Sequence, residues 1–150
     1  MQANDITIRA AARGDLEHLA ILYAELNAHD EVLEPHSAAQ IYEQVLAHPG
    51  LTIFVAAHNE RAIATATLVV VPNFTRGGRP YAVIENVVTL KDFRGQGLGR
   101  SVVKHAIAAA WDASCYKVML LTGRTDPAVH RFYEGCGFIQ NKTGFQIRNP

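Results

Sequence analysis

A short glycine-rich turn constrains this chain more than any other stretch, because it joins an apolar run to a segment with helical spacing. The turn reads RGQGLGR over residues 94–100. Glycine allows close approach of a ligand, and the first turn of a helix presents N–H groups that have no partner inside the helix. Such a junction predicts a site where backbone N–H groups bind a phosphate. The contributing residues would be Arg94, Gly95, Gln96, Gly97, Leu98, Gly99 and Arg100.

The spacing of the glycines excludes two common phosphate-binding motifs. The dinucleotide fingerprint G-x-G-x-x-G requires a glycine where this chain has Arg100. The P-loop requires Gly-Lys followed by Ser or Thr, and the chain contains no such triplet. The pattern that fits is Arg-x-x-Gly-x-Gly after an apolar strand. The alternative interpretation is a tight strand-to-helix connection that binds nothing.

A second motif, RFYEGCGF, follows at residues 131–138. The two motifs together resemble the GNAT superfamily of acyl-CoA-dependent N-acyltransferases, and the resemblance covers roughly residues 82–146. In that family the glycine-rich loop binds the pyrophosphate of coenzyme A, so the resemblance implies acetyl-CoA as co-substrate. The run over residues 84–138 also has some resemblance to glucosamine-6-phosphate N-acetyltransferases.

The predicted elements follow an order similar to that family. Hydrophobic periodicity predicts strands over 6–9, 51–57, 62–71, 81–90 and 116–121, helices over 16–28, 37–46, 98–110 and 127–134, and a last strand or two within 138–148. A strand–helix–strand crossover makes its two strands parallel. We therefore expect an α/β (α+β) GNAT-type fold with a mixed, mostly antiparallel sheet, a splayed central parallel strand pair and about four helices. Residues 1–150 would form a single domain.

Two helix starts have capping signals. Ser37 and Gln40 form a capping-box pattern, which predicts that the second helix begins at Ser37. Asp126 followed by Pro127 predicts the cap and first residue of the last helix.

Composition limits the classes of partner. Fourteen basic and fourteen acidic residues give no net field for a polyanion, so nucleic acid is not expected. The two cysteines are expected to be reduced, as in a cytoplasmic protein, and the seven scattered histidines give no metal site. No apolar run is long enough to predict a membrane span.

Two residues are candidates for catalysis. Tyr133 occupies the place of the family's motif tyrosine, which implies a general acid for the leaving thiolate, and a phenol is protonated at neutral pH. The alternative is a core tyrosine that closes the last helix. Glu85 lies in an apolar strand, so it either faces a cleft, where it can orient the amine or accept its proton, or it is a structural hydrogen-bonding residue.

The resemblance also implies contacts to the cofactor. The backbone of Val87, Val88 and Thr89 would pair with the pantetheine arm, and one of these N–H groups would donate to the reacting carbonyl oxygen. Arg94 and Arg100 either add positive charge near the phosphates or remain solvated. Many family members have asparagine where this chain has Asp126, so an amide contact there is replaced by a carboxylate.

The acceptor is less constrained by the sequence. In similar proteins the acceptor pocket includes the loop between the first two helices, which here carries Asp30, Glu31 and Glu34, and the loop from Arg76 to Arg79. Acidic residues favour a cationic amine, whereas arginines favour a phosphate or carboxylate on the acceptor. We expect a small-molecule amine. The alternatives are a protein N-terminal or lysine acetyltransferase and a catalytically silent acyl-CoA-binding regulatory module. A homodimer is also expected, as in similar proteins.

Overall fold

The computed structural model describes residues 6–149. These residues divide into two compact units, one that extends through Leu120 and one that begins at Leu121. The prediction of a single domain stays a prediction.

The first unit contains a five-stranded mixed sheet in the order β1-β2-β3-β4-β5. Its elements are β1 (Ile6–Ala10), α1 (Leu16–Leu26), α2 (Pro35–Ala47), β2 (Leu51–His58), β3 (Arg61–Val71), β4 (Tyr81–Thr89), α3 (Leu98–Asp112) and β5 (Val118–Met119), with short 3-10 turns at Arg13–Asp15, Arg76–Gly78 and Lys91–Phe93. The first four strands are antiparallel neighbours, and β5 pairs parallel to β4. The predicted fold class is confirmed.

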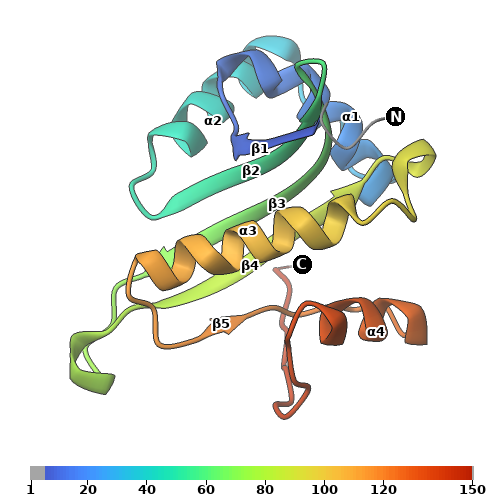
Figure 1. The fold of residues 1–150 in the computed structure, drawn as a ribbon. Helices are drawn as coiled ribbons and strands as arrows, with labels where there is room; N and C mark the ends of the chain where they lie inside the picture. The colour runs from blue at the N-terminus through green and yellow to red at the C-terminus, as the bar shows by residue number, and fades with distance from the viewer. Residues whose placement is uncertain (1–5, 150) are drawn as a thin grey trace. The chain divides into compact units, whose positions relative to one another are not determined.

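Helices cover both faces of the central strands. The Phe54 ring of β2 packs edge-on against His105 of α3, with ring centroids 4.9 Å apart. Because successive strand side chains point to opposite faces, Val55 and its cross-strand partner Thr65 lie on the other face, toward Tyr23 of α1. Burial on both faces explains why β2 and β3 read as nearly continuous apolar runs. Figure 1 shows α3 across one face of the sheet.

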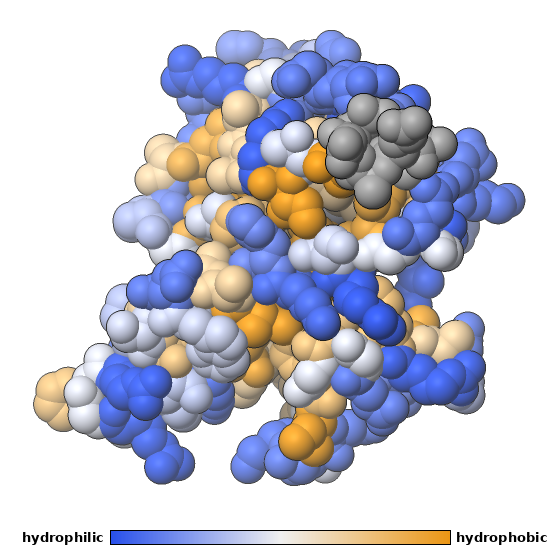
Figure 2. Space-filling view, viewed as in Figure 1, coloured by the Kyte–Doolittle hydropathy of each residue, from blue (hydrophilic) through white to orange (hydrophobic). Residues whose placement is uncertain are grey.

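The outer surface of α3 is polar. Arg100, Lys104 and His105 are exposed on it, whereas Val102, Val103 and Ala106 of the same helix are buried. Figure 2 shows hydrophilic side chains across the middle of this face, where Figure 1 places α3. This amphipathic pattern explains how an alanine-rich helix packs closely on the sheet while remaining wetted on its outer side.

The predicted start of the second helix is wrong by two residues. α2 begins at Pro35, and Glu34 caps it by accepting hydrogen bonds from the N–H groups of His36 and Ser37. Ser37 therefore donates to the cap and does not form the predicted capping box with Gln40. Proline at the first helical position fixes the backbone angle two residues earlier than the Ser37 pattern suggested.

The parallel pair is shorter than predicted and lies at the end of the described sheet, not at its centre. Only Ala82 and Val83 of β4 pair with Val118 and Met119 of β5, although residues 116–121 were predicted as a strand. β4 continues for six residues beyond this pairing, to Thr89. Both residues of β5 pair, so β4 extends past the end of β5, and its outer edge beyond Val83 pairs with no strand of the described structure. The splay of the parallel pair stays a prediction.

The second unit contains α4 (Pro127–Gly135) and an irregular C-terminal segment. Asp126 caps α4 as predicted, because its Oδ1 accepts a hydrogen bond from the Ala128 N–H at 2.8 Å. The last strand or two predicted within residues 138–148 is wrong for the described structure, in which residues 138–149 form no strand. Side-chain alternation indicates which way residues point, but a strand also needs a partner backbone.

The described residues contain two buried cysteines, but no group of metal ligands and no helix that could span a membrane. Cys115 and Cys136 are buried free thiols, and burial raises the pKa of Cys115. No three His, Cys, Asp or Glu side chains within residues 6–149 are grouped so that they could hold a metal. None of the helices described is long and apolar enough to cross a membrane.

Candidate active site

The glycine-rich turn lies between the end of β4 and the start of α3. Gly95 and Gly97 have positive φ values of 76° and 80°, which side-chain-bearing residues rarely adopt. Gly97 is the N-cap residue of α3, and no side chain caps the helix there. The N–H groups of the first turn are therefore not satisfied by a side chain, and they carry the positive end of the helix dipole.

The space around this turn is open. A Cβ atom built at Gly95 or Gly97 meets no other atom within 4 Å. Packing thus does not require glycine at either position, and the two reasons that remain are the left-handed backbone and access for a ligand. The turn has the shape and the donor groups of a phosphate site, so the chain's own residues fit the pyrophosphate of coenzyme A.

A β-bulge interrupts β4 next to Glu85. Thr67 of β3 pairs with Glu85, but Thr65 pairs with Val88, so β4 has one residue more than β3 between these rungs. Asn86 within the bulge has a φ of 52°. A bulge bends its strand and increases the twist, and bulges are common beside active sites. The sequence analysis missed this feature, although the exposed polar pair Glu85 and Asn86 in an apolar run was a signal for it.

The end of β4 directs backbone groups away from β3. The Leu90 N–H donates to the Ile63 oxygen at 3.0 Å. In an antiparallel ladder neighbouring residues point their N–H and C=O groups to opposite edges, so those of Thr89, just before Leu90, face the outer edge of β4 beyond the end of β5. Of the three residues predicted to contact pantetheine, Thr89 thus lies at this open edge, while the Val88 side chain is buried.

Arg94 contacts protein groups at both ends of its guanidinium. Its Nε donates to the backbone carbonyl oxygen of Thr89 at 2.9 Å, and its Nη2 donates to Oε2 of Glu25 on α1 at 3.2 Å. Arg100, in contrast, is exposed on the first turn of α3. The predicted phosphate contacts of both arginines stay predictions.

Glu85 lies on the sheet face that α1 covers. It is exposed, and its cross-strand partner Thr67 is buried, with 5% of its surface accessible. Burial raises the pKa of Tyr23, against the smaller opposite effect of the nearby Thr67 and Thr65 hydroxyls. Oγ1 of Thr67 nevertheless lacks a hydrogen bond of acceptable geometry among the described residues. This face therefore combines one exposed carboxylate with buried hydroxyl groups.

The residues expected around the acceptor have separate environments. Hydrogen bonds from the backbone N–H groups of His36 and Ser37 hold the pKa of Glu34 below its usual value. Asp30 and Glu31 are exposed. Their predicted role in the acceptor pocket stays a prediction.

The loop over residues 76–79 is fastened to the segment before β5. Arg79 donates to the backbone oxygens of Ser114 and Cys115 at 3.4 and 3.3 Å. The Arg76 guanidinium lies 5.7 Å from the centre of the Tyr116 ring. The structure therefore gives both arginines contacts within the first unit.

Tyr133 lies in α4 of the second unit. Its ring is half-buried and packs edge-on against Phe132 and Phe138, with centroid distances of 5.0 and 6.2 Å. The backbone N–H groups of Cys136 and Phe138 donate to the backbone carbonyl oxygen of Tyr133. The structure thus describes how the helix end holds Tyr133 in place, and its role as an acid stays a prediction.

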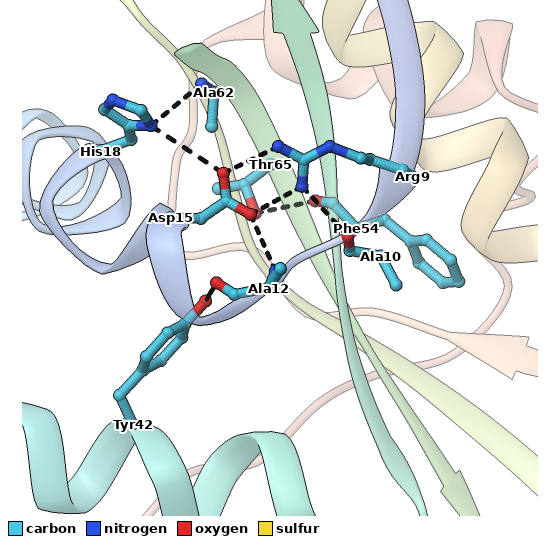
Figure 3. Close-up of polar contacts among 9 residues, drawn as sticks. All are labelled: Arg9, Ala10, Ala12, Asp15, His18, Tyr42, Phe54, Ala62 and Thr65. Carbon is cyan, nitrogen blue, oxygen red and sulfur yellow. Dashed lines mark hydrogen bonds and ion pairs between the residues drawn. The ribbon is translucent and has the colours of Figure 1, made fainter. Parts of the chain in front are cut away.

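One polar cluster in the first unit was not found by sequence reasoning. Asp15 is 2% exposed, and Figure 3 shows its carboxylate enclosed by Arg9, the Ala12 N–H and His18. Arg9 Nη1 and Nη2 donate to the two carboxylate oxygens at 2.6 and 3.0 Å, and the Ala12 N–H donates at 2.8 Å. Tyr42 of α2 donates to the Ala12 oxygen at 2.8 Å. The cluster therefore fastens β1 and α2 to the start of α1.

The Asp15 cluster has a shallow hollow beside it. This hollow has a volume of about 420 Å³ and is lined in part by Arg9, His18 and Glu60. The carboxylate of Asp15 is already fully engaged by its neighbours. The cluster therefore has a structural explanation that needs no ligand.

Comparison with known proteins places this geometry in a family. The sequence profile of the Acetyltransferase (GNAT) family matches residues 18–138. A glucosamine 6-phosphate N-acetyltransferase of Trypanosoma brucei brucei is 31% identical over 134 residues, which cover 83% of this chain and 89% of that protein. The chain therefore belongs to the GNAT family, and the resemblance inferred from the two motifs is confirmed.

Two further comparisons narrow the class of enzyme. A probable glucosamine 6-phosphate N-acetyltransferase 2 of Oryza sativa subsp. japonica is 39% identical over 85 residues, which cover 57% of this chain but only 49% of that protein. A solved structure described as a putative acetyltransferase from Agrobacterium tumefaciens str. C58 has a TM-score of 0.93 at 62% identity, covering 95% of this chain and 99% of that one. Family and relatives support an acetyl-CoA-dependent N-acetyltransferase.

Proposed function

We propose that this protein transfers the acetyl group of acetyl-CoA to a primary amine of a small molecule, by direct attack of the amine within a ternary complex. The observation that carries the proposal is the junction of β4 and α3. There an uncapped helix N-terminus with open glycines follows, after the 3-10 turn at Lys91–Phe93, a strand whose outer edge beyond Val83 pairs with no strand of the described structure. A diphosphate and an extended amide-containing arm are the parts of coenzyme A that suit these two features.

Each residue of the site has a proposed role. Backbone N–H groups of residues 95–100 would bind the pyrophosphate. The backbone of residues 87–89 would bind the arm and donate a hydrogen bond to the reacting carbonyl oxygen, which stabilises the charge that develops there. Glu85 would orient the acceptor amine or take its proton, and Tyr133 would protonate the leaving thiolate. Acetyl-CoA supplies the acetyl thioester when bound.

Among small-molecule acceptors, an amino sugar phosphate is the first to test. The support is that the trypanosomal and rice relatives are both named as glucosamine 6-phosphate N-acetyltransferases. The exposed carboxylate of Glu85 suits a cationic amino group. We also propose a homodimer that acts in the cytoplasm, and light scattering after size exclusion measures the oligomeric state.

Thiol release tests the proposal directly. Wild-type protein and acetyl-CoA are incubated with a panel of amines, with glucosamine 6-phosphate and a lysine peptide included, and the free thiol is measured with dithionitrobenzoate. We expect release that depends on a small amine. Turnover with the peptide alone favours a protein acetyltransferase. Binding of CoA without turnover on any acceptor favours the silent regulatory module, and absence of both rejects the proposal.

A variant of Glu85 tests the acceptor side of the site. We expect Glu85→Gln to lower kcat/KM for the amine by about tenfold or more, because the amide neither takes a proton nor carries a charge. The dissociation constant of CoA should stay unchanged. Glu60→Gln, in the exposed turn between β2 and β3, is the matched control and should leave both quantities unchanged.

A further inference from the structure

A glutamate at the end of α1 contacts the beginning of the glycine-rich turn. Oε2 of Glu25 accepts a hydrogen bond from the Lys91 N–H at 2.8 Å and one from Arg94 Nη2 at 3.2 Å. Arg94 Nε in turn donates to the Thr89 oxygen at 2.9 Å. We call these contacts of Glu25, Lys91 and Arg94 the Glu25 clamp.

The Glu25 clamp joins three elements that are distant in sequence. Glu25 belongs to the last turn of α1, Thr89 is the last residue of β4, and Lys91 begins the 3-10 turn that leads to the glycines. Arg94 directly precedes Gly95, the first residue of the turn with a positive φ. The clamp therefore fixes the position from which the glycine-rich turn starts.

The clamp also uses groups that a ligand would otherwise meet. The Thr89 oxygen points to the open edge of β4, and Arg94 occupies it. The positive charge of Arg94 is directed at the carboxylate of Glu25, whose side chain is 34% exposed. An isolated arginine–carboxylate pair at such exposure contributes little to stability. Glu25 accepts from the backbone N–H of Lys91, and Arg94 donates to the backbone oxygen of Thr89. These contacts indicate that the pair positions the backbone on which the glycine-rich turn begins.

We propose that Glu25 is a positioning residue for the cofactor, which acts through Lys91 and Arg94 on the glycine-rich turn. This inference rests on the proposed function. It assigns Arg94 to the protein framework and leaves phosphate binding to the backbone N–H groups. It also links the cofactor turn to residues 27–34, the expected acceptor loop, because that loop begins directly after Leu26 at the end of α1.

Calorimetry with CoA separates positioning from direct phosphate binding by Arg94. If Glu25 positions the turn, Glu25→Ala and Arg94→Ala should each weaken CoA binding by about tenfold. The double variant should bind CoA no more weakly than the more affected single variant, because both substitutions remove one contact. Under direct binding, Arg94→Ala weakens binding while Glu25→Ala leaves it unchanged or tighter, because Arg94 is released toward the phosphates. That second pattern overturns the inference.

Control and conservative variants separate positioning from a general loss of structure. Glu17→Ala, an exposed glutamate in the first turn of α1, should leave the affinity for CoA unchanged. Glu25→Gln keeps an oxygen for the Lys91 N–H and should recover most of the affinity. In turnover, Glu25→Ala should raise KM for acetyl-CoA while kcat at saturation changes less than about twofold. An equal fall of kcat in Glu25→Ala and Glu25→Gln without a change in KM contradicts positioning.

Hydrogen exchange gives a readout that does not depend on any ligand. Amide exchange in the segment over residues 89–97 should be faster in Glu25→Ala than in Glu17→Ala, with the exchange of β2 and β3 unchanged. If wild type fails to bind CoA, the proposed function is rejected, and this exchange comparison still decides the inference. Equal exchange in the two variants shows that Glu25 does not hold the turn.

Discussion

Arg9 and Asp15 meet through two parallel hydrogen bonds, Nη1 to Oδ2 at 2.6 Å and Nη2 to Oδ1 at 3.0 Å. Burial raises the pKa of Asp15, but the hydrogen bonds from Arg9 and the Ala12 N–H outweigh it, so the pKa lies below its usual value. A lowered pKa in the folded state means that ionised Asp15 stabilises the fold above its unfolded-state pKa of about 3.9. This stabilisation is lost as the pH falls through the folded-state pKa.

We therefore expect Asp15→Asn to lower the free energy of unfolding by about 2–3 kcal/mol at pH 7. The difference from wild type should shrink as the pH falls below about 4, because wild type then loses the same charge. Urea unfolding followed by circular dichroism at several pH values measures it. Glu17→Gln serves as the control, and a difference that is constant over the whole pH range contradicts the assignment.

Gly97 offers a matched test of the glycine-rich turn. Gly97→Ala and Gly77→Ala both place a side chain on a backbone with positive φ, 80° and 69°, and neither new Cβ meets an atom within 4 Å. Each should therefore destabilise the fold by about 1 kcal/mol. Only Gly97→Ala should also weaken CoA binding, by about tenfold. Equal CoA affinity of the two variants in calorimetry excludes the turn as the phosphate site.

Tyr133 is tested by removal of its hydroxyl group. If the phenol protonates the leaving thiolate, Tyr133→Phe should lower kcat by about 10²-fold with both substrates saturating. The ring contacts with Phe132 and Phe138 remain in this variant, so the melting temperature should change little. Tyr81→Phe, at the start of β4, is the control. An unchanged kcat in Tyr133→Phe assigns the tyrosine to packing of the helix end.

Thr65 and Thr67 differ in one hydrogen bond and invite a paired substitution. Thr65 Oγ1 donates to the backbone oxygen of Phe54 at 2.9 Å. Thr67 Oγ1 is buried and makes no such hydrogen bond within the described structure. Thr65→Val should therefore destabilise the fold by about 1 kcal/mol, and Thr67→Val should be neutral or stabilising. Denaturant unfolding measures both. A larger loss in Thr67→Val than in Thr65→Val would show that the Thr67 hydroxyl, which lies near Tyr23, stabilises the fold, and it would contradict this prediction.

The parts of the fold that sequence reasoning predicted correctly rest on local chemistry. β2 and β3 are apolar and β-branched runs around a polar turn at residues 58–61, which is sufficient to indicate a hairpin. The glycine-rich turn was predicted to join a strand to a helix, and it lies between β4 and α3. Asp126 with Pro127 marked the start of α4. In each case the signal and the structure lie within a few residues of each other.

The features that were missed depend on which residue begins an element and on which distant residues pair. Neither can be read from the few residues around each position. The Ser37 pattern predicted the start of α2, but Glu34 caps the helix and Pro35 is its first residue. The hydrogen bond from Arg94 to Glu25 joins residues 69 positions apart, which periodicity does not reveal. Residues 138–149 alternate like a strand but pair with none in the described structure.

The extra residue of β4 interrupts the sheet beside Glu85. A β4 without Asn86 would keep Glu85 and Val88 opposite Thr67 and Thr65 and would continue the ladder without interruption. Such a strand would be straighter and less twisted at this point. Deletion of Asn86 alone would thus restore a regular ladder, and the chain tolerates this interruption of the β3–β4 ladder beside the proposed site. The proposed site thus differs from a regular sheet by an irregularity of the backbone, and not by any single side chain.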